Sequence, residues 1–294
     1  MAREPIEILG AGLCGSLLAV MLAKRGFPVT VREARPDPRG TQQSAGRSIN
    51  LALSARGIRA LKTAGVMQHV EALLLPMRGR MIHETDGSTE LLPYGARDHE
   101  VINSVSRAGL NRLLIDVAER EYGVEIRFEH AVTGYDVARA VALLEGPEGG
   151  YELPARALLC ADGAGSRIRR AYDDGGRIGP TESLLPHGYK ELTIPPGKDG
   201  GFLLDEAALH IWPRSDFMLI ALPNPGGDFT LTLFMPNDGD PGFSSLETEA
   251  QVDAFFDEHF ADAAALIPEL GATFISNPVG ILGTVRCRHW HDGD

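Results

Sequence analysis

The chain has 294 residues, 44% of them hydrophobic and 23% charged, and its formal net charge is −12. This length and composition are typical of a globular protein with one large or two modest domains. The acidic balance argues against a nucleic-acid partner and against binding to an anionic membrane surface. The three cysteines are few and widely spaced, so no disulfide framework is indicated and a reducing, cytoplasmic location is expected.

The N-terminal elements predict a βαβ unit. Residues 6–9 (IEIL) form an apolar strand pattern, residues 16–26 a helix pattern that ends at Gly26, and residues 28–33 a second strand. The chain enters the first strand without a signal-peptide pattern. The apolar run that follows is too short and too interrupted by glycine to span a bilayer.

The middle of the chain predicts two helices around a hairpin. We expect one helix capped by Ser54 and ending near Gly65, and an amphipathic helix in the segment GLNRLLIDVAEREYG. Between them, residues 79–95 predict a hairpin with Asp86-Gly87 at its turn. A strand-rich segment and the short helix SRIRRAY follow.

From about Pro180 the pattern changes to apolar runs separated by Pro, Gly and Asp, which predicts an antiparallel sheet. The segment TEAQVDAFFDEHF predicts a helix against that sheet, and VGILGTVRCRHW a late strand. The expected fold is α/β, with a Rossmann-like βαβ domain and a β-rich second domain. We place the first domain at 1–179, with an interleaved hairpin near 76–104, and the second at 180–275. Residues 276–294 are expected to return toward the first domain without completing it.

The glycines after the first strand have the spacing G-x-G-x-x-G, at Gly10, Gly12 and Gly15. A strand precedes them, a helix follows, and Glu33 ends the second strand about 20 residues later, where an acidic residue binds a ribose hydroxyl. Such glycines let the backbone approach a pyrophosphate at the helix N-terminus. The motif therefore predicts dinucleotide binding; the alternative is a tight strand–helix turn without a ligand.

A second motif distinguishes FAD from NAD. The segment LLCADGAGSRIRR resembles the Asp-Gly motif of the flavin-dependent aromatic hydroxylases, which lies near both flavin and pyridine nucleotide in that superfamily. The segment SVSRAGLNRLL matches the superfamily's arginine near the flavin, here Arg107. The resemblance implies that the dinucleotide is FAD.

Longer segments, including GRSINLALSARGIRAL, EVINSVSRAGLNRLL and PHGYKELTIPP, resemble the kynurenine 3-monooxygenase family over nearly the whole chain. That family takes electrons from NADPH, uses O2, and hydroxylates L-kynurenine to 3-hydroxykynurenine. The cofactor performs the chemistry, so neither a catalytic protein nucleophile nor a metal is implied. His289 and His291 could share a strand face and bind a metal, but we interpret them as surface residues of a terminal strand.

The resemblance also implies site residues. The residues carried over to FAD binding are Gly10, Gly12, Leu13, Gly15, Glu33, Ala34, Arg35, Ala52, Arg107, Val132, Asp162 and Gly163. Arg80 matches the family's carboxylate-binding arginine and Tyr94 its tyrosine partner, in keeping with the two charge-assisted hydrogen bonds that a guanidinium forms with a carboxylate. The positions that match the wall around the aromatic ring are Leu209, Ile220, Leu222, Thr232 and Phe234. Without the resemblance, Arg80 would be interpreted as a solvated strand residue and the wall positions as sheet core.

The chain departs from the family at its end, RCRHWHDGD. The family's second flavin signature, its C-terminal helical region and the substrate ligands of that region have no match here. We therefore expect weak or absent flavin binding and no coupled hydroxylation by these 294 residues alone. Two alternatives stay open: a related flavin hydroxylase of another aromatic substrate, and an inactive fragment that binds FAD poorly.

Overall fold

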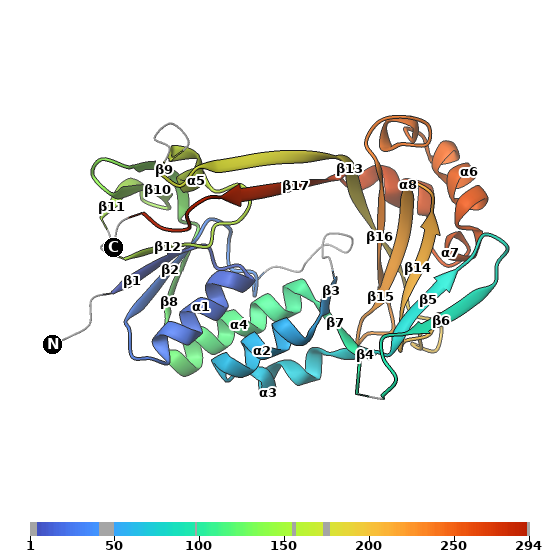
Figure 1. The fold of residues 1–294 in the computed structure, drawn as a ribbon, viewed down its shortest axis with the longest axis horizontal. Coiled ribbons are helices and arrows are strands. Elements are labelled where there is room, and N and C mark those ends of the chain that lie inside the picture. The colour runs from blue at the N-terminus through green and yellow to red at the C-terminus, as the bar shows by residue number, and fades with distance from the viewer. Residues whose placement is uncertain (1–4, 41–49, 98, 155–156, 173–176, 293–294) are drawn as a thin grey trace.

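The computed structural model describes residues 5–40, 50–97, 99–154, 157–172 and 177–292. The start of the motif GRSINLALS, residues 46–49, lies outside the described residues. Figure 1 shows two parts side by side, an N-terminal part with most of the helices and a large sheet with its own helices, connected along one side by two long strands.

The N-terminal part is built on a parallel four-stranded sheet. Its strands, in spatial order, are β12 (Leu158–Cys160), β1 (Ile6–Leu9), β2 (Val29–Glu33) and β8 (Glu125–Phe128). All three neighbouring pairs are parallel. The predicted βαβ opening is confirmed, because β1 and β2 pair in parallel and a helix connects them.

Four helices pack beside this sheet (Figure 1). They are α1 (Leu13–Ala23), α2 (Ala55–Ala64), α3 (Met67–Val70) and α4 (Arg107–Tyr122), with the short 3₁₀ turn η1 (Glu71–Leu73) after α3. Their apolar faces and the sheet form one core, in which Ile8, Val31 and Leu114 are almost completely buried. Burial of these periodic apolar residues stabilises the helices more than their intrinsic propensity does.

Helix α1 begins at Leu13, three residues before the predicted start at Ser16. The reason is a close backbone contact. A Cβ on Gly15 would lie 1.9 Å from the carbonyl oxygen of Gly10, so glycine lets the helix start directly beneath the end of β1. The third glycine of the motif thus belongs to the first turn of the helix.

The other helix ends follow the sequence signals in most respects. Ser106 caps α4, because its hydroxyl accepts a hydrogen bond from the N–H of Gly109, and Gly123 ends the helix in the left-handed conformation. Helix α2 begins after Ser54 and ends at the left-handed Gly65, as predicted. The predicted cap is wrong in one respect: the Ser54 side chain forms no capping hydrogen bond.

Two three-stranded sheets complete the N-terminal part. One has the order β3 (Asn50–Leu53), β7 (Ile102–Ser106) and β4 (Leu75–Met77). The other has the order β11 (Gly149–Pro154), β10 (Val141–Gly146) and β9 (Ala131–Asp136), and helix α5 (Arg167–Ala171) packs against β9.

The large sheet has seven strands. Their spatial order is β17 (Gly280–Cys287), β13 (Pro180–Ile194), β16 (Phe229–Pro236), β15 (Phe217–Pro223), β14 (Ala208–Arg214), β5 (Gly79–His83) and β6 (Thr89–Pro93). The predicted antiparallel sheet is confirmed, except that β14 and β5 are parallel. The predicted hairpin is also confirmed: β5 and β6 pair across a turn that contains the left-handed Gly87.

Helices cover one face of the large sheet (Figure 1). They are α6 (Glu249–His259), α7 (Ala261–Ala264) and α8 (Leu270–Ser276), preceded by the 3₁₀ turn η2 (Phe243–Ser245). The core between sheet and helices contains the fully buried Trp212, Phe229, Phe256 and Phe274.

Strand β13 is longer than the segment KELTI suggested, because its first half pairs with β17. Strand β17 ends at Cys287, so His289 and His291 are exposed but lie beyond the strand. Within the described part of the chain, no helix is both long enough and apolar enough to cross a membrane. The domain limits at 179 and 275 stay predictions.

Candidate functional site

The glycine loop connects the end of β1 to the start of α1 against the end of β12. Gly10 has a φ of +100°, and a Cβ there would lie 2.5 Å from the carbonyl oxygen of Ala161. A Cβ on Gly12, in contrast, would meet no atom of the protein within 4 Å. No side chain caps the N-terminus of α1. The backbone is therefore open to a ligand at Gly12, at a helix end that favours anions.

Glu33 holds this loop to the end of β2. Its Oε2 accepts a 2.8 Å hydrogen bond from the N–H of Ala11, and its Oε1 accepts bonds from the N–H and the Nε of Arg35. Burial alone would raise the pKa of Glu33, but the hydrogen bonds from Arg35 and Ala11 outweigh it and lower that pKa. The carboxylate is thus ionised and ready to accept hydrogen bonds from hydroxyl groups.

The Asp-Gly motif lies beside the glycine loop. The N–H of Ala161 donates to the carbonyl of Leu9 over 2.7 Å, and the Cα of Asp162 lies 3.0 Å from the position that a Cβ on Gly10 would occupy. Gly163 is exposed and left-handed, with a φ of +88°. The two predicted motifs, about 150 residues apart in the sequence, therefore meet where two adjacent parallel strands end.

The remaining predicted flavin residues differ in their exposure to solvent. Leu13 begins α1, while Ala34 and Arg35 are exposed immediately after β2. Ala52 is exposed on β3, and Val132 packs against the apolar cluster that contains Leu9. Of these residues, Arg35 is ion-paired with Glu33.

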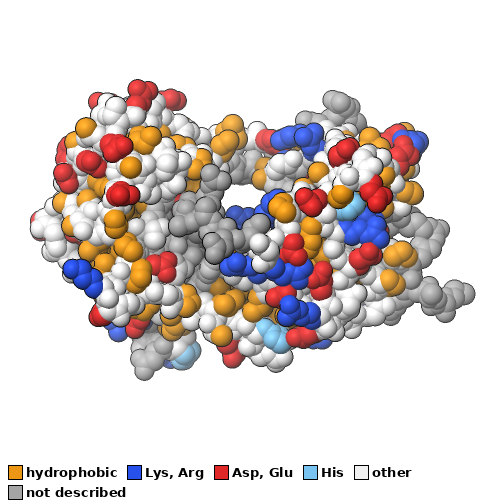
Figure 2. All heavy atoms as spheres, turned by 180° about the vertical axis from the view of Figure 1, so that it is seen from behind, with side chains coloured by type: hydrophobic (Ala, Val, Ile, Leu, Met, Phe, Trp, Pro, Cys, Tyr) orange, Lys and Arg blue, Asp and Glu red, His pale blue; other side chains and the backbone are white. Residues whose placement is uncertain are grey.

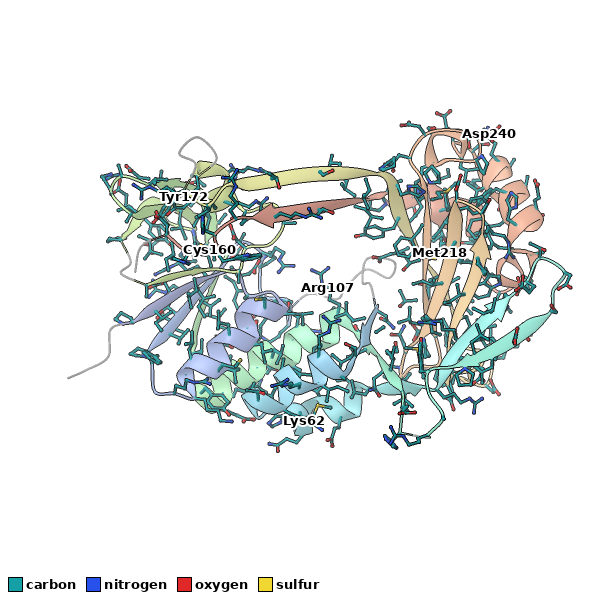
Figure 3. The ribbon with its side chains drawn as sticks, viewed as in Figure 1. Lys62, Arg107, Cys160, Tyr172, Met218 and Asp240 are labelled. Atoms are coloured by element: carbon teal, nitrogen blue, oxygen red, sulfur yellow. The ribbon has the colours of Figure 1, made fainter. Side chains whose placement is uncertain are left out.

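Arg107 is exposed at the first position of α4 (Figure 3). One turn further on, Asn111 donates from Nδ2 to the carbonyl of Ala11 over 2.8 Å, and Ser16 Oγ donates to the same oxygen over 3.0 Å. Sequence reasoning missed Asn111 and Ser16. The available signal was a polar residue on the apolar face of each of two helices that pack together.

The predicted substrate residues share one face of the large sheet. In the register of the strands, Leu209 pairs with Arg80, and Ile220 pairs with Thr232. Alternate residues of the same strands, including Trp212, Leu219 and Leu231, belong to the core beneath the helices. Since side chains alternate along a strand, the predicted residues point away from those helices.

This helix-free face is turned toward the N-terminal part (Figures 1 and 3). The space-filling view in Figure 2 shows an opening through the molecule between the two parts, with Lys and Arg side chains gathered along one edge. The face thus borders a hollow that lies between the large sheet and the helices of the N-terminal part.

Arg80 and Tyr94 are in contact at the end of this face. The guanidinium carbon of Arg80 lies 5.1 Å from the ring centroid of Tyr94, a cation–π distance. Burial raises the pKa of Tyr94, and the charge of Arg80 opposes that shift. Arg80 is exposed, and no carboxylate within the described ranges pairs with it. Its charge is therefore available to an anionic ligand.

Polar contacts connect the large sheet with the N-terminal part. Asn50 donates from Nδ2 to Oδ1 of Asn224 over 2.7 Å, and Ser104 Oγ donates to the carbonyl of Pro223 over 2.8 Å. Asn50 and Ser104 are buried. Sequence reasoning missed all of these residues, because nothing in the local pattern indicates that β3 and β7 meet the end of β15.

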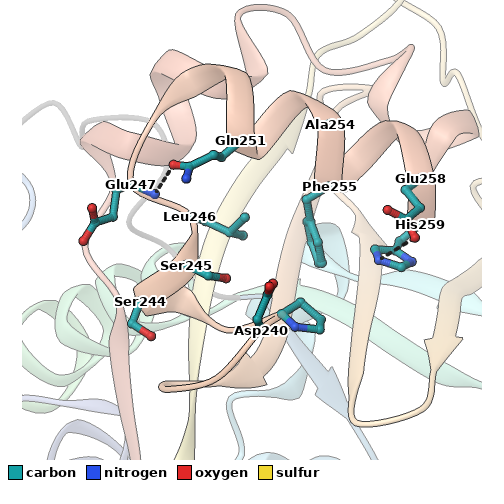
Figure 4. A pocket seen from close by; sticks show the side chains of 11 residues that line it. Asp240, Ser244, Ser245, Leu246, Glu247, Gln251, Ala254, Phe255, Glu258 and His259 are labelled. Carbon is teal, nitrogen blue, oxygen red and sulfur yellow. Dashed lines mark hydrogen bonds and ion pairs between the residues drawn. The ribbon is translucent and has the colours of Figure 1, made fainter.

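A cavity of about 670 Å³ lies elsewhere, between α6 and the segment that precedes it (Figure 4). Its lining includes Asp240, Ser245, Gln251, Phe255 and His259. None of the predicted cofactor or substrate residues lines it. The predicted cofactor and substrate residues therefore lie outside this cavity.

The sequence of residues 4–183 matches the family described as the FAD binding domain. Kynurenine 3-monooxygenase of Stenotrophomonas maltophilia is 44% identical over 292 residues, which cover 99% of this chain and 64% of that protein. Kynurenine 3-monooxygenase of Myxococcus xanthus is also 44% identical, over 99% of this chain and 63% of that protein. The chain thus spans somewhat less than two thirds of the length of these curated relatives.

Solved structures show the same fold at lower sequence identity. The tetrameric form of 2-methyl-3-hydroxypyridine-5-carboxylic acid oxygenase superposes with a TM-score of 0.73 at 18% identity, covering 99% of this chain and 73% of that one. The tetracycline destructase Tet(51) superposes with a TM-score of 0.63 at 14% identity, covering 99% and 72%. At these identities the likeness shows the fold alone.

Proposed function

Because the chain belongs to the FAD-binding domain family, we propose that it carries the cofactor and substrate residues of an FAD-dependent kynurenine 3-monooxygenase. In this proposal the reaction is the hydroxylation of L-kynurenine to 3-hydroxykynurenine, with NADPH as electron donor and O2 as oxygen source. The 44% identity to kynurenine 3-monooxygenases along nearly the whole chain supports the choice of substrate.

The shared orientation of the predicted substrate residues is the structural observation that best supports the proposal. Apart from Tyr94, which follows β6, the residues that the resemblance assigned to the substrate come from β5, β14, β15 and β16, and by the strand register they share a single sheet face. That face is the one free of helices and turned toward the N-terminal part of the chain, which contains the glycine loop (Figure 1). Residues of the sheet core would instead face the helices.

The residues around the glycine loop fit FAD. The open space at Gly12 and the uncapped N-terminus of α1 suit a pyrophosphate, and the ionised Glu33 suits a ribose hydroxyl. Arg35, whose side chain is 67% exposed, is ion-paired with Glu33 at this position. When bound, FAD supplies the redox chemistry by which electrons from NADPH and an oxygen atom from O2 hydroxylate an aromatic ring.

The protein's own residues bind and orient the substrate. Arg80 binds the α-carboxylate of kynurenine through two charge-assisted hydrogen bonds. The ring of Tyr94 positions the guanidinium through their cation–π contact. Apolar side chains such as Leu222 and Phe234 pack against the aromatic ring and exclude water from the reacting carbon. The protein contributes no nucleophile.

NADPH as the reductant and a cytoplasmic location belong to the same proposal. The three cysteines are all free in the structure, which suits a reducing compartment. The partners are then small molecules, L-kynurenine, NADPH and O2.

The test is spectroscopic and then kinetic. The purified protein is titrated with FAD and with NAD, and flavin absorbance reports binding. NADPH oxidation is then followed with and without L-kynurenine, and the products are separated by chromatography. Binding of FAD and stimulation of NADPH oxidation by L-kynurenine support the proposal, and the chromatography shows whether oxygen reaches the ring or is released as peroxide. Tight NAD binding without flavin affinity contradicts the cofactor, and turnover of another aromatic acid but not kynurenine contradicts the substrate.

A further inference from the structure

Glu191 lies on the substrate face of the large sheet. It is in β13, where its neighbours Leu192 and Ile194 belong to the core beneath the helices. Glu191 pairs with Thr232, and Thr232 pairs with Ile220. Directly paired residues of adjacent strands point to the same side. Glu191 therefore belongs to the same cross-strand row as two of the residues assigned to the ring-binding wall.

The carboxyl group of Glu191 is buried without full hydrogen bonding. The residue is only 8% exposed, and its Oε2 has no hydrogen-bond partner within the described part of the chain. The next residue provides a contrast, because the buried Lys190 donates from Nζ to the carbonyl of Phe274 over 2.6 Å. A buried acceptor without a donor costs free energy. A buried group of this kind calls for an explanation, and a bound ligand that brings a hydrogen-bond donor is one.

The nearest opposing charge to the Glu191 carboxyl comes from the N-terminal part. Burial raises the pKa of that carboxyl, and the charge that opposes this shift is that of Arg107 at the start of α4. Arg107 belongs to the N-terminal part, across the hollow from the sheet (Figure 3). The backbone at this point is held in place, since Asn277 donates from Nδ2 to the carbonyl of Glu191 over 2.8 Å. The strand register thus puts the carboxyl on the helix-free face, within range of the charge of Arg107.

We infer that Glu191 determines specificity by accepting a hydrogen bond from the aromatic amino group of the substrate. This inference rests on the proposed function, because it takes a kynurenine-like amine as the ligand. Oε2 of Glu191 lacks a hydrogen-bond donor within the described residues. The amino group on the aromatic ring of a kynurenine is a donor that would lie beside the ring-wall residues next to Glu191.

The positions of the two charged residues set the orientation of the substrate. Arg80 is on β5, whereas Glu191 on β13 is paired with Thr232 and lies in one cross-strand row with Ile220, beside two of the residues assigned to the wall around the aromatic ring. A substrate carboxylate bound at Arg80 leaves the aromatic end to extend toward β13. A second carboxylate at that end would be repelled by Glu191, whereas an amine is attracted.

The test compares two ligands and three variants. L-kynurenine and its analogue without the ring amino group are titrated by calorimetry into the FAD-loaded protein and into Glu191→Leu and Glu191→Gln. For Glu191→Leu we expect the Kd of kynurenine to rise at least tenfold and that of the analogue to stay within twofold or fall, since a charged hydrogen bond has been removed. Glu191→Gln, which keeps the shape and an acceptor oxygen, should lie between wild type and Glu191→Leu.

Glu90→Gln serves as the matched control. Glu90 pairs with Ile82 on β5 at the far edge of the same sheet, but it is exposed, and neither Kd should change. A stability readout separates a ligand role from a structural one: thermal unfolding of Glu191→Leu without ligand should occur at the wild-type temperature or higher, because the variant removes an unsatisfied buried carboxyl.

Two results would overturn the inference. One is an equal loss of affinity for both ligands, and the other is unchanged affinity for kynurenine in Glu191→Leu. Both require that the wild-type protein binds kynurenine. A wild-type protein that binds FAD but not kynurenine contradicts the proposed function itself, and is thereby distinguishable from failure at Glu191.

Discussion

The carboxylate of Glu33 and the backbone N–H of Ala11 are joined by a 2.8 Å hydrogen bond between residues 22 positions apart. This bond connects the end of β2 to the glycine loop and keeps the loop in the conformation in which Gly12 faces open space. Glu33 is only 6% exposed, so it shapes the loop before any ligand binds.

The first prediction concerns this residue. Glu33→Ala should weaken FAD binding by about 1–3 kcal/mol, the range of a hydrogen bond to a buried charged group. Titration of flavin fluorescence measures the change. Glu125→Ala, an exposed glutamate on the neighbouring strand β8, serves as the control and should leave FAD affinity within experimental error. Equal affinity in Glu33→Ala and wild type would remove Glu33 from the cofactor site.

The second prediction separates the roles of two glycines. A Cβ on Gly15 would lie 1.9 Å from the carbonyl oxygen of Gly10, whereas a Cβ on Gly12 would meet nothing within 4 Å. Gly15→Ala should therefore lower the free energy of unfolding of the protein without ligand. Gly12→Ala should leave that free energy within about 1 kcal/mol of wild type and impair FAD binding by blocking the close approach of the pyrophosphate.

Chemical denaturation without FAD and flavin titration together check this pair. Loss of stability in Gly12→Ala, or normal FAD binding by that variant, would contradict the assignment of the open space to the cofactor.

The third prediction concerns Arg80. In a protein that joins this chain to the C-terminal region of its relatives, Arg80→Ala should raise the KM for kynurenine about tenfold to a hundredfold, because the substrate carboxylate loses a bidentate charged partner. Arg80→Lys should recover only part of the loss, since an ammonium cannot form the two-pronged contact. Arg78→Ala is the control: Arg78 pairs with Asp205, and its loss should change KM little. Steady-state kinetics with unchanged KM in Arg80→Ala would exclude Arg80 from the site.

The fourth prediction concerns pH and a buried pair of histidines. His210 Nε2 lies 2.9 Å from the carbonyl of Asp205, and its Nδ1 lies 2.9 Å from His83 Nε2. The carbonyl can only accept, so His210 donates from Nε2 and, when neutral, accepts from His83 at Nδ1. Burial is the main cause that lowers the pKa of His210 to about 4, and the charge of His83 adds to the shift.

The consequence for stability follows from the direction of this shift. The unfolded chain, with an ordinary histidine pKa near 6.5, binds more protons than the folded protein. The contribution of His210 is therefore complete above that pKa and is lost as the pH falls toward 4. Between pH 7 and pH 5 the loss should be about 2 kcal/mol.

Denaturant unfolding at the two pH values measures this loss. His210→Gln should lose about 2 kcal/mol less than wild type over the same interval, whereas His99→Gln, at an exposed position, should behave as wild type. An identical pH dependence in wild type and His210→Gln would show that His210 does not titrate in this way.

Local signals in the sequence determined the elements of this protein and the motif of its cofactor site. The apolar run IEIL became β1, Gly65 and Gly123 ended their helices, and Asp86-Gly87 formed the hairpin turn. Each depends on residues that are neighbours in the chain, because hydrophobic periodicity and the freedom of glycine act over one or two turns. The family resemblance then indicated Arg80 and the wall residues, although local pattern alone would have made Arg80 a solvated strand residue and the wall residues part of a sheet core.

Only the tertiary structure decided which residues meet across long distances in the sequence. The parallel pairing of β5 with β14 brings Arg80 beside Leu209, and the pairing of β13 with β16 puts Glu191 beside Thr232. The local sequence does not distinguish Glu191 from a charged residue on an exposed strand. Only the pairing of β13 with β16 shows that it is buried. The physical reason is that strand order, register and the choice of covered face are set by packing between distant segments, which no local pattern encodes.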